Sequence, residues 1–296
     1  MSDLENIKAW CMLDVLSQDN LIDHAISSLG KAYSHIDTCC YSSNHRLRIA
    51  VLMHKPSGIE FNLVVGGDFI MGLSETEEDI ITGLSIDAED FVANMKPTRQ
   101  IRVKPFLMSR FPLLNEFIQR QKAFNSSRLR PSACDDESDI GTAYLTRDEA
   151  ISLANRYGFE LPSEAQWEYS CRAMTKTPFY FGNSLPDEDE LDRGGMRTCF
   201  TDSELTESAI NSFGLISMHA GSWCSDSYRD CYLHLPSTDI PIEGSAPYSV
   251  RGGAACVWPW QDTDEWIMAL SAFRTNSEDI DAAFDGHFPA RFVKRL

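Results

Sequence analysis

The stretch that decides the fold is Leu161-Pro162-Ser163-Glu164-Ala165-Gln166-Trp167-Glu168-Tyr169. Ser163 and Gln166 form a capping box, in which the serine hydroxyl accepts an amide hydrogen at the start of a helix and the glutamine reaches back to the serine amide. The pattern predicts a helix over 164–173. Trp167 and Tyr169 are expected in the core, because large aromatic side chains bury most of their surface.

Other helices are predicted from the same kinds of signal. Thr146 and Glu149 form a second capping box, and Gly158 ends that helix. Apolar residues recur at helical spacing over 4–29 and again over 113–124. After residue 174 no long helical period appears.

Strands are predicted where apolar residues alternate or run together. Residues 46–53 and 59–65 flank the turn sequence Pro56-Ser57-Gly58, which indicates a hairpin. Residues 69–72 and 100–107 are further predicted strands, while the acidic stretch 73–95 is predicted to be a loop. The chain therefore reads as an α+β protein with few helices, short strands and abundant irregular structure.

The composition bounds the possible partners. The 296 residues carry a formal net charge of -18, which disfavours phosphate backbones and anionic lipid, so neither nucleic acid nor a membrane is expected as a partner. Alternatively, the excess acid only keeps the protein in solution. The N-terminus has no basic region leading into an apolar run, so a cytoplasmic location is expected. The nine cysteines contain no CxxC pair and are expected to be free thiols.

Five motifs follow one another in an order that resembles a known family. They are Gly66-Gly67-Asp68-Phe69-Ile70-Met71-Gly72, the 161–169 stretch, Asn211-Ser212-Phe213-Gly214-Leu215, Val250-Arg251-Gly252-Gly253, and Ala272-Phe273-Arg274-Thr275-Asn276. Together they resemble the sulfatase-modifying-factor, or formylglycine-generating-enzyme-like, family. The resemblance covers residues 58–296 and implies a loop-rich, C-type-lectin-like domain there, preceded by an N-terminal helical and hairpin extension over 1–57.

The metal chemistry of that family is not matched. Its formylglycine-generating members hold copper with two cysteines about five residues apart after the glycine turn, because soft thiolates suit Cu(I). Cys256 lies near the first position, and no cysteine follows it. The family's calcium-associated loop also loses its asparagine and glutamate in the matching run 218–223. No metal and no cofactor is therefore expected, and copper or calcium belongs only to the alternative below.

Other enzyme classes have no support in the sequence. The histidines at 24, 35, 45 and 54 lack the spacing of the iron-binding motif found in the sulfoxide-synthase branch of the family. No GxSxG, HExxH or P-loop sequence occurs.

The sequence thus favours a non-catalytic binding module that presents loops to a protein or small-molecule ligand. The segment after the glycine turn, residues 256–266, is the expected partner-facing site. It carries Trp258 and Trp260, and tryptophan is enriched in binding hot spots. The candidate binding residues are Trp258, Trp260, Asp262, Arg274 and Asn276, with Asp264 and Glu265 as a polar rim. The alternatives that both tryptophans pack internally, and that Arg274 only bonds loop carbonyls, stay open.

The alternative function is a residual oxidase of the formylglycine-generating type, acting on a cysteine or another peptide side chain. Cys256 is then the catalytic thiol, and Cys224 or Cys231 is the candidate for a second ligand. A second sulfur or a histidine nitrogen beside Cys256 favours this alternative. The sequence does not indicate an oligomeric state.

Overall fold

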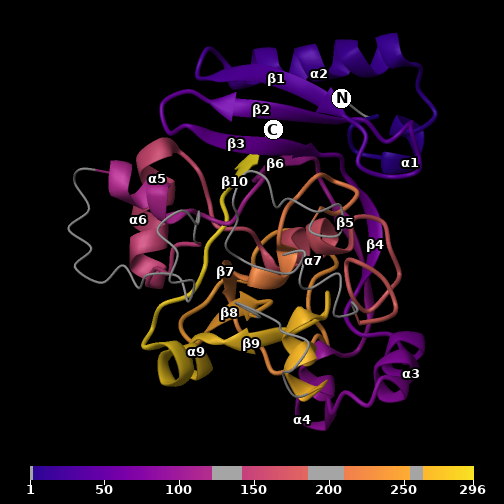
Figure 1. The fold of residues 1–296 in the computed structure, drawn as a ribbon, viewed down its shortest axis with the longest axis vertical. Helices are drawn as coiled ribbons and strands as arrows, with labels where there is room; N and C mark the ends of the chain where they lie inside the picture. The colour runs from indigo at the N-terminus through magenta and orange to yellow at the C-terminus, as the bar shows by residue number, and fades with distance from the viewer. Residues whose placement is uncertain (1–2, 122–141, 186–209, 254–262) are drawn as a thin grey trace.

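The computed structural model describes residues 3–121, 142–185, 210–253 and 263–296 (Figure 1). The helices of these residues are α1 (Ile7–Trp10), α2 (Val15–Leu29), α3 (Glu75–Gly83), α4 (Glu89–Val92), η1 (Ala93–Met95), α5 (Asn115–Arg120), α6 (Arg147–Tyr157), α7 (Glu164–Arg172), η3 (Met218–Ala220), η4 (Thr263–Ala269) and α9 (Ser277–Phe284). The strands are β1 (Tyr33–Cys39), β2 (Ile49–His54), β3 (Ile59–Val64), β4 (Gly67–Met71), β5 (Arg99–Val103), β6 (Phe106–Ser109), β7 (Ser222–Ser227), β8 (Tyr248–Arg251), β9 (Arg274–Asn276) and β10 (Val293–Arg295). None of the described helices is both long and apolar enough to cross a membrane.

The largest sheet joins the two ends of the chain. Its five strands lie in the order β1-β2-β3-β6-β10, and every neighbouring pair is antiparallel. The predicted hairpin is confirmed as β2 and β3, with Leu52 opposite Phe61. Helix α2 lies along β1 at one end of the molecule (Figure 1). The strands before residue 57 and those after it therefore form one sheet.

Two smaller sheets complete the framework, β4–β5 and β7–β8–β9. The single strand predicted over 100–107 is wrong, because β5 and β6 belong to different sheets and are separated by Lys104 and Pro105. Proline cannot donate to a strand ladder, so pairing stops there. The backbone of Gly66 lies close to the end of β5. A Cβ on Gly66 would lie 2.6 Å from the Val103 carbonyl oxygen, which explains why residue 66 is a glycine.

The helix predicted from residues 161–169 is α7, and it lies at the centre of the molecule (Figure 1). All nine of its residues are buried, including Trp167 and Tyr169. Its capping box is confirmed, since the Gln166 amide donates to the Ser163 hydroxyl at 3.1 Å and the Ser163 amide donates to the Gln166 side chain at 3.0 Å. The capping box of α6 at Thr146 is also present.

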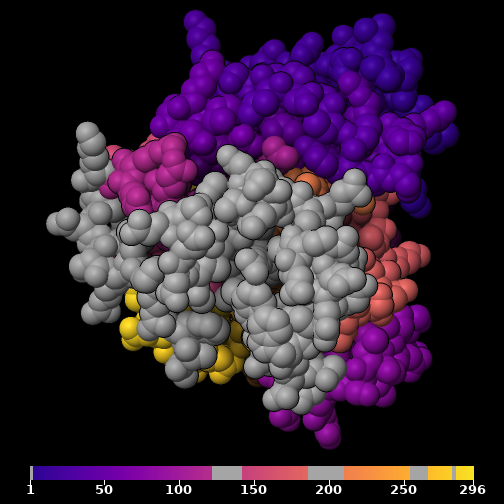
Figure 2. Space-filling view, viewed as in Figure 1, coloured from indigo at the N-terminus to yellow at the C-terminus, as the bar shows by residue number. Residues whose placement is uncertain are grey.

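The N-terminal residues pack against the rest of the protein and form hydrogen bonds with it. The predicted helix over 4–29 is divided into α1 and α2, because Asp14 starts a new helix by accepting the Ser17 amide at 2.7 Å. Trp10 is buried and donates its indole N–H to the Arg48 carbonyl at 3.1 Å. The Ile7 amide donates to the Gly66 carbonyl at 2.8 Å. Figure 2 shows these indigo residues covering one end of the molecule.

Five short helices depart from the sequence prediction. The predicted loop over 73–95 is wrong, because it contains α3, α4 and η1. Its start carries a capping box between Ser74 and Glu77, which the acidic composition obscured. The helix predicted over 113–124 is shorter, with α5 ending at Arg120, and α9 was not predicted at all. Helices of six to nine residues contain too few turns for a clear apolar period.

Candidate functional site

The motifs of the sequence converge on a group of buried charges. Three of its residues come from α7, one from β8, one from β9 and one from α3: Glu164, Glu168, Arg172, Arg251, Arg274 and Glu77. All six side chains are buried. We call these six residues the ion-pair network. Three carboxylates face three guanidinium groups, so their charges balance, as buried charges require.

Glu164 and Arg274 form the most regular pair of the network. The Arg274 Nε donates to Glu164 Oε2 at 2.7 Å, and its Nη2 donates to Oε1 at 2.7 Å. The Ser249 hydroxyl donates to Oε1 at 2.5 Å. Burial alone would raise the pKa of Glu164, but the charges of Arg274 and Arg251 outweigh it and lower the pKa to about 2. Glu164 is therefore ionised at neutral pH.

Glu168 links the remaining members. One of its oxygens accepts from Arg251 Nη2, and the other accepts from Arg172 Nε at 2.8 Å. The same oxygen also accepts the Gly72 amide at 2.8 Å. Arg172 extends the network to α3 through Glu77, at 2.6 Å. The network thus ties α7 to the first glycine motif and to the two C-terminal motifs.

Arg274 and Asn276 were predicted as binding residues. The Arg274 side chain is fully buried, and its Nη1 donates to the Asn94 carbonyl of η1 at 2.9 Å and to the Arg229 carbonyl at 2.6 Å, so the alternative that it bonds a loop carbonyl is confirmed at Arg229. Asn276 is half-buried and caps α9, with its side-chain oxygen accepting the amides of Glu278 and Asp279. Direct binding of a partner by either residue stays a prediction.

The glycine turn that precedes the candidate segment is sterically fixed. Gly252 has φ +65° and Gly221 has φ +75°, a region that favours glycine. A Cβ on Gly252 would lie 2.6 Å from the Gly221 Cα, and one on Gly221 would lie 2.5 Å from the Arg251 carbonyl oxygen. The Gly253 amide also donates to the His219 carbonyl at 3.2 Å. The position of Gly253, the last described residue before the segment, is therefore fixed.

The chain is anchored again at Trp266, the last residue of the predicted segment 256–266. Trp266 of η4 is buried, and its ring lies 6.4 Å from that of Phe179 and 6.3 Å from that of Phe181, in edge-to-face arrangements. The predicted site residues Cys256, Trp258, Trp260 and Asp262 lie outside the described residues. Asp264 and Glu265 belong to η4, but only their backbone is described.

The buried thiols do not fit a copper site. Cys224 is fully buried, and its burial together with the charges of Glu164 and Asp226 raises the pKa of the thiol well above 9.0. Burial likewise raises the pKa of Cys171 to about 11. A thiol that stays protonated is neither a nucleophile nor a copper ligand. Cys224 is thus unsuited to replace the missing second cysteine of the family.

The 218–223 run does not fit a calcium site either. Ser222 is the only residue in this run whose side chain carries oxygen. Its hydroxyl donates to the Trp223 carbonyl at 2.9 Å and accepts the Arg291 amide at 3.0 Å. Calcium takes six to eight oxygen ligands, and this hydroxyl is already engaged within the fold.

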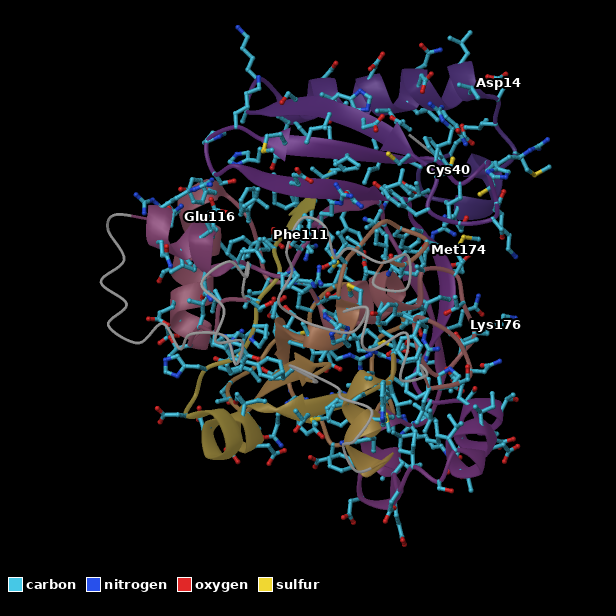
Figure 3. The ribbon with its side chains drawn as sticks, viewed as in Figure 1. Asp14, Cys40, Phe111, Glu116, Met174 and Lys176 are labelled. Carbon is cyan, nitrogen blue, oxygen red and sulfur yellow. The ribbon has the colours of Figure 1, made fainter. Side chains whose placement is uncertain are left out.

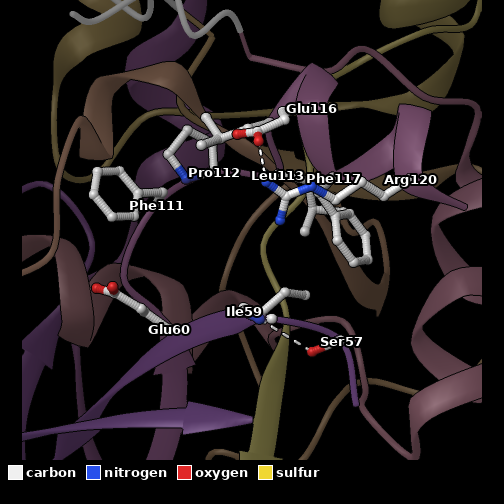
Figure 4. Close-up of a pocket in the computed structure, with 11 residues that line it drawn as sticks. Ser57, Ile59, Glu60, Phe111, Pro112, Leu113, Glu116, Phe117 and Arg120 are labelled. Carbon is white, nitrogen blue, oxygen red and sulfur yellow. Dashed lines mark hydrogen bonds and ion pairs between the residues drawn. The ribbon is translucent and has the colours of Figure 1, made fainter. Parts of the chain in front are cut away.

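One small cavity lies between β3 and α5. It encloses about 180 Å³ and is lined by Ser57, Ile59, Phe111, Phe117 and neighbouring residues (Figure 4). Glu116 and Arg120 pair with each other at its border. Pockets for organic ligands are usually larger than about 300 Å³, so this cavity is not assigned a ligand.

Sequence reasoning missed three residues around the network. Glu77 was assigned to a loop, although Ser74 three residues earlier is a signal that identifies it. The Tyr232 hydroxyl accepts from Arg251 Nη1 at 2.7 Å. Asp226 accepts the amides of Glu164 and Ile242, each at 2.9 Å, and burial with the nearby Glu164 charge raises its pKa to about 7. Nothing in the local sequence marks Tyr232 or Asp226.

Comparisons with known proteins agree with this architecture. Two solved structures share it: PvdO from Pseudomonas aeruginosa, with a TM-score of 0.54 and 17% identity, and Treponema denticola variable protein 1, with a TM-score of 0.52 and 14% identity. The first comparison covers 89% of this chain and 99% of PvdO, and the second covers 81% and 97%. The fold is therefore formylglycine-generating-enzyme-like and C-type-lectin-like, as predicted.

A sequence relative and a family match complete the comparison. The uncharacterized protein YfmG of Bacillus subtilis is 24% identical over 237 residues, which are 74% of this chain and 44% of YfmG. The chain thus spans less than half the length of that relative. The sulfatase-modifying factor enzyme 1-like domain matches residues 51–285. Because that match covers most of the chain and includes the network, the protein belongs to the sulfatase-modifying factor enzyme 1-like domain family.

Proposed function

We propose that this protein is a non-catalytic binding module, in which a rigid family scaffold presents residues 254–262 to a protein or small-molecule ligand. Binding loops are commonly carried between fixed points of a rigid frame, because the frame limits the entropy that is lost on binding. Trp258 and Trp260 are the proposed anchors, and Asp262 belongs to the polar rim.

The observation that carries the proposal is the anchoring of the chain on both sides of this segment. On one side Gly253 follows a turn pressed against Gly221, and on the other Trp266 packs edge-on against the stacked rings of Phe179 and Phe181. The ion-pair network lies directly before the turn at Arg251 and holds β8 to α7. These contacts give a fixed frame on which loop residues can vary without loss of the fold.

The chemistry of the described residues also favours binding over oxidation. The charged residues of the family motifs are used in mutual pairs, and the thiols of Cys171 and Cys224 are held in the protonated form. A residual oxidase needs a second soft ligand close to Cys256. We therefore place the oxidase second, and a copper titration separates the two functions.

Replacement of the segment tests the proposal. Residues 254–262 are exchanged for a glycine–serine linker of equal length, and the variant is compared with the natural chain in thermal unfolding and in affinity capture from native lysate. We expect a folded variant that loses the specifically captured ligand. Retention of the same ligand by the folded variant would show that recognition lies elsewhere.

A further inference from the structure

A second concave site lies away from the proposed recognition segment. It is a cavity of about 450 Å³ between α1, the β4–β5 strand pair, the start of α3 and the residues at and after the end of α7. Its lining includes Ile7, Lys8, Phe69, Ile70, Tyr169 and Lys176. This volume lies within the range of about 300–1,000 Å³ that is usual for small organic ligands. None of the lining residues comes from 251–270.

The cavity has an apolar and aromatic wall. The rings of Phe69 and Tyr169 lie 5.3 Å apart at 62°. Tyr169 is buried and donates its hydroxyl to the Val65 carbonyl at 2.8 Å, so its polar atom is already satisfied. Ile70 and Met174 also line the cavity, and both are large apolar side chains that remain exposed, at 51% and 47%. Apolar side chains exposed around a cavity are typical of a binding site for an apolar group.

The backbone holds Met174 and its neighbours in an uncommon conformation. Ala173 and Met174 have φ values of +42° and +75°, which residues other than glycine rarely adopt. The turn is fixed because both the amide and the hydroxyl of Thr175 donate to the Arg172 carbonyl at 2.8 Å. Figure 3 shows Met174 and Lys176 at the edge of the molecule beside β4. Such strain persists only where surrounding contacts enforce it, and it often marks binding sites.

The lining of the cavity carries three basic side chains, Lys8, Arg172 and Lys176, and two acidic ones, Asp68 and Glu77. Glu77 is paired with Arg172 at 2.6 Å, and Asp68 lies 3.7 Å from Arg102. Lys8 and Lys176 are exposed, and neither takes part in an ion pair among the residues that the structure describes. In a chain of net charge -18, two unpaired ammonium groups beside an apolar cavity favour a ligand with a negative charge.

We propose that this cavity binds a small organic anion with an apolar body. The body packs on Phe69, Tyr169, Ile70 and Met174, and the anionic group is held by Lys8 and Lys176. The site is independent of the proposed recognition segment, because it is built from α1, β4, β5, the start of α3, and α7 with the residues that follow it.

A matched pair of fluorescent probes tests this site. The anion 8-anilinonaphthalene-1-sulfonate and its uncharged analogue N-phenyl-1-naphthylamine share one aromatic body and differ in the sulfonate. We expect saturable binding of the sulfonate with one probe per chain. The double variant Lys8→Gln/Lys176→Gln should weaken sulfonate binding by about fivefold to tenfold and change binding of the neutral probe by less than about twofold.

Two controls make the result specific. The double variant Lys31→Gln/Lys104→Gln removes the same charge from exposed lysines outside the cavity and should leave both probes within about twofold. Ile70→Glu, at an exposed position, should weaken binding of both probes while the melting temperature stays close to that of the natural chain. Equal loss of sulfonate binding in the two lysine variants, or unchanged binding in Ile70→Glu, would overturn the proposal.

Discussion

The guanidinium of Arg274 meets the carboxylate of Glu164 through two parallel hydrogen bonds, both 2.7 Å long, in the interior of the protein. Such two-point pairs between arginine and a carboxylate fix orientation as well as distance. The pair joins α7 to β9 and, through the carbonyls of Asn94 and Arg229, to η1 and to the loop after β7. Loss of this buried pair should therefore lower the free energy of unfolding much more than loss of an exposed pair.

Glu164→Gln should destabilise the fold by about 3–5 kcal/mol, because Arg274 keeps its charge but loses its partner in a buried position. The control is Glu160→Gln, which removes the exposed pair with Arg295, and it should cost less than about 1 kcal/mol. Denaturant unfolding of both variants measures the two values. Similar losses of unfolding free energy in the two variants would show that the buried pair stabilises the fold no more than the exposed pair does.

The stability should also depend on pH through Asp226. The folded pKa of about 7 lies above the ordinary value of 3.8, so the contribution of Asp226 is fully present below about pH 4 and is lost as the pH rises through 7. Relative to Asp226→Asn, the natural chain should lose up to about 1.4 kcal/mol of unfolding free energy per pH unit in this window. The exposed Asp230→Asn variant controls for the removal of one charge. Parallel pH curves for the natural chain and Asp226→Asn would contradict the assignment.

Glu164 should act in the opposite direction at acid pH. Its folded pKa of about 2 lies below the ordinary 4.5, so its contribution is present above 4.5 and is lost as the pH falls through 2. Acid unfolding of the natural chain and of Glu164→Gln measures this contribution. The difference in unfolding free energy between the natural chain and the variant should shrink as the pH falls below about 4.5. A constant difference between the two down to pH 2 would refute it.

Gly221→Ala should destabilise the protein by at least about 2 kcal/mol, because φ is +75° and the new Cβ would press against the backbone of Arg251 and Gly252. Gly83→Ala is the matched control, since its Cβ meets nothing within 4 Å and the residue lies in α3. That change should be neutral or stabilise by up to about 1 kcal/mol. Thermal unfolding of the two variants gives the comparison, and equal stabilities would remove the steric argument for a fixed turn.

Copper(I) should not bind tightly to the reduced protein. Cys256 supplies one soft ligand, and the buried Cys224 thiol stays protonated. A titration against a competing Cu(I) chelator measures the affinity, with Cys40→Ser as a control for an exposed thiol. A tight stoichiometric site that disappears in Cys256→Ser would instead support the oxidase.

Much of the fold was predictable because its signals are local. The capping boxes at Thr146 and Ser163 identify α6 and α7 from hydrogen bonds that span three residues, and the turn at Pro56–Gly58 identifies the β2–β3 hairpin. The predicted long strand over 100–107 failed because local alternation does not reveal a change of sheet at Pro105. The short helix α3 was missed although Ser74 and Glu77 carry the same signal as the other two.

The site was less predictable because its contacts are remote in sequence. Glu77 and Arg172 are 95 residues apart, and Glu164 and Arg274 are 110 apart. Composition and periodicity identify these side chains as charged but do not say which acid meets which arginine. The cavity beside Phe69 combines four segments that are distant in sequence in the same way, so no single motif indicates it.

The most direct test of the account is a paired measurement on Trp258→Ala and Trp260→Ala, with the exposed Leu233→Ala as a control. Isothermal titration with the ligand identified by capture gives the affinity, and denaturant unfolding gives the stability. At least one tryptophan variant should lose about 2 kcal/mol of binding free energy, roughly 30-fold in affinity, while its unfolding free energy stays within about 0.5 kcal/mol of the natural chain. Unchanged binding with a loss of about 3–5 kcal/mol of stability would mean that both tryptophans belong to the core and would contradict the proposed recognition segment.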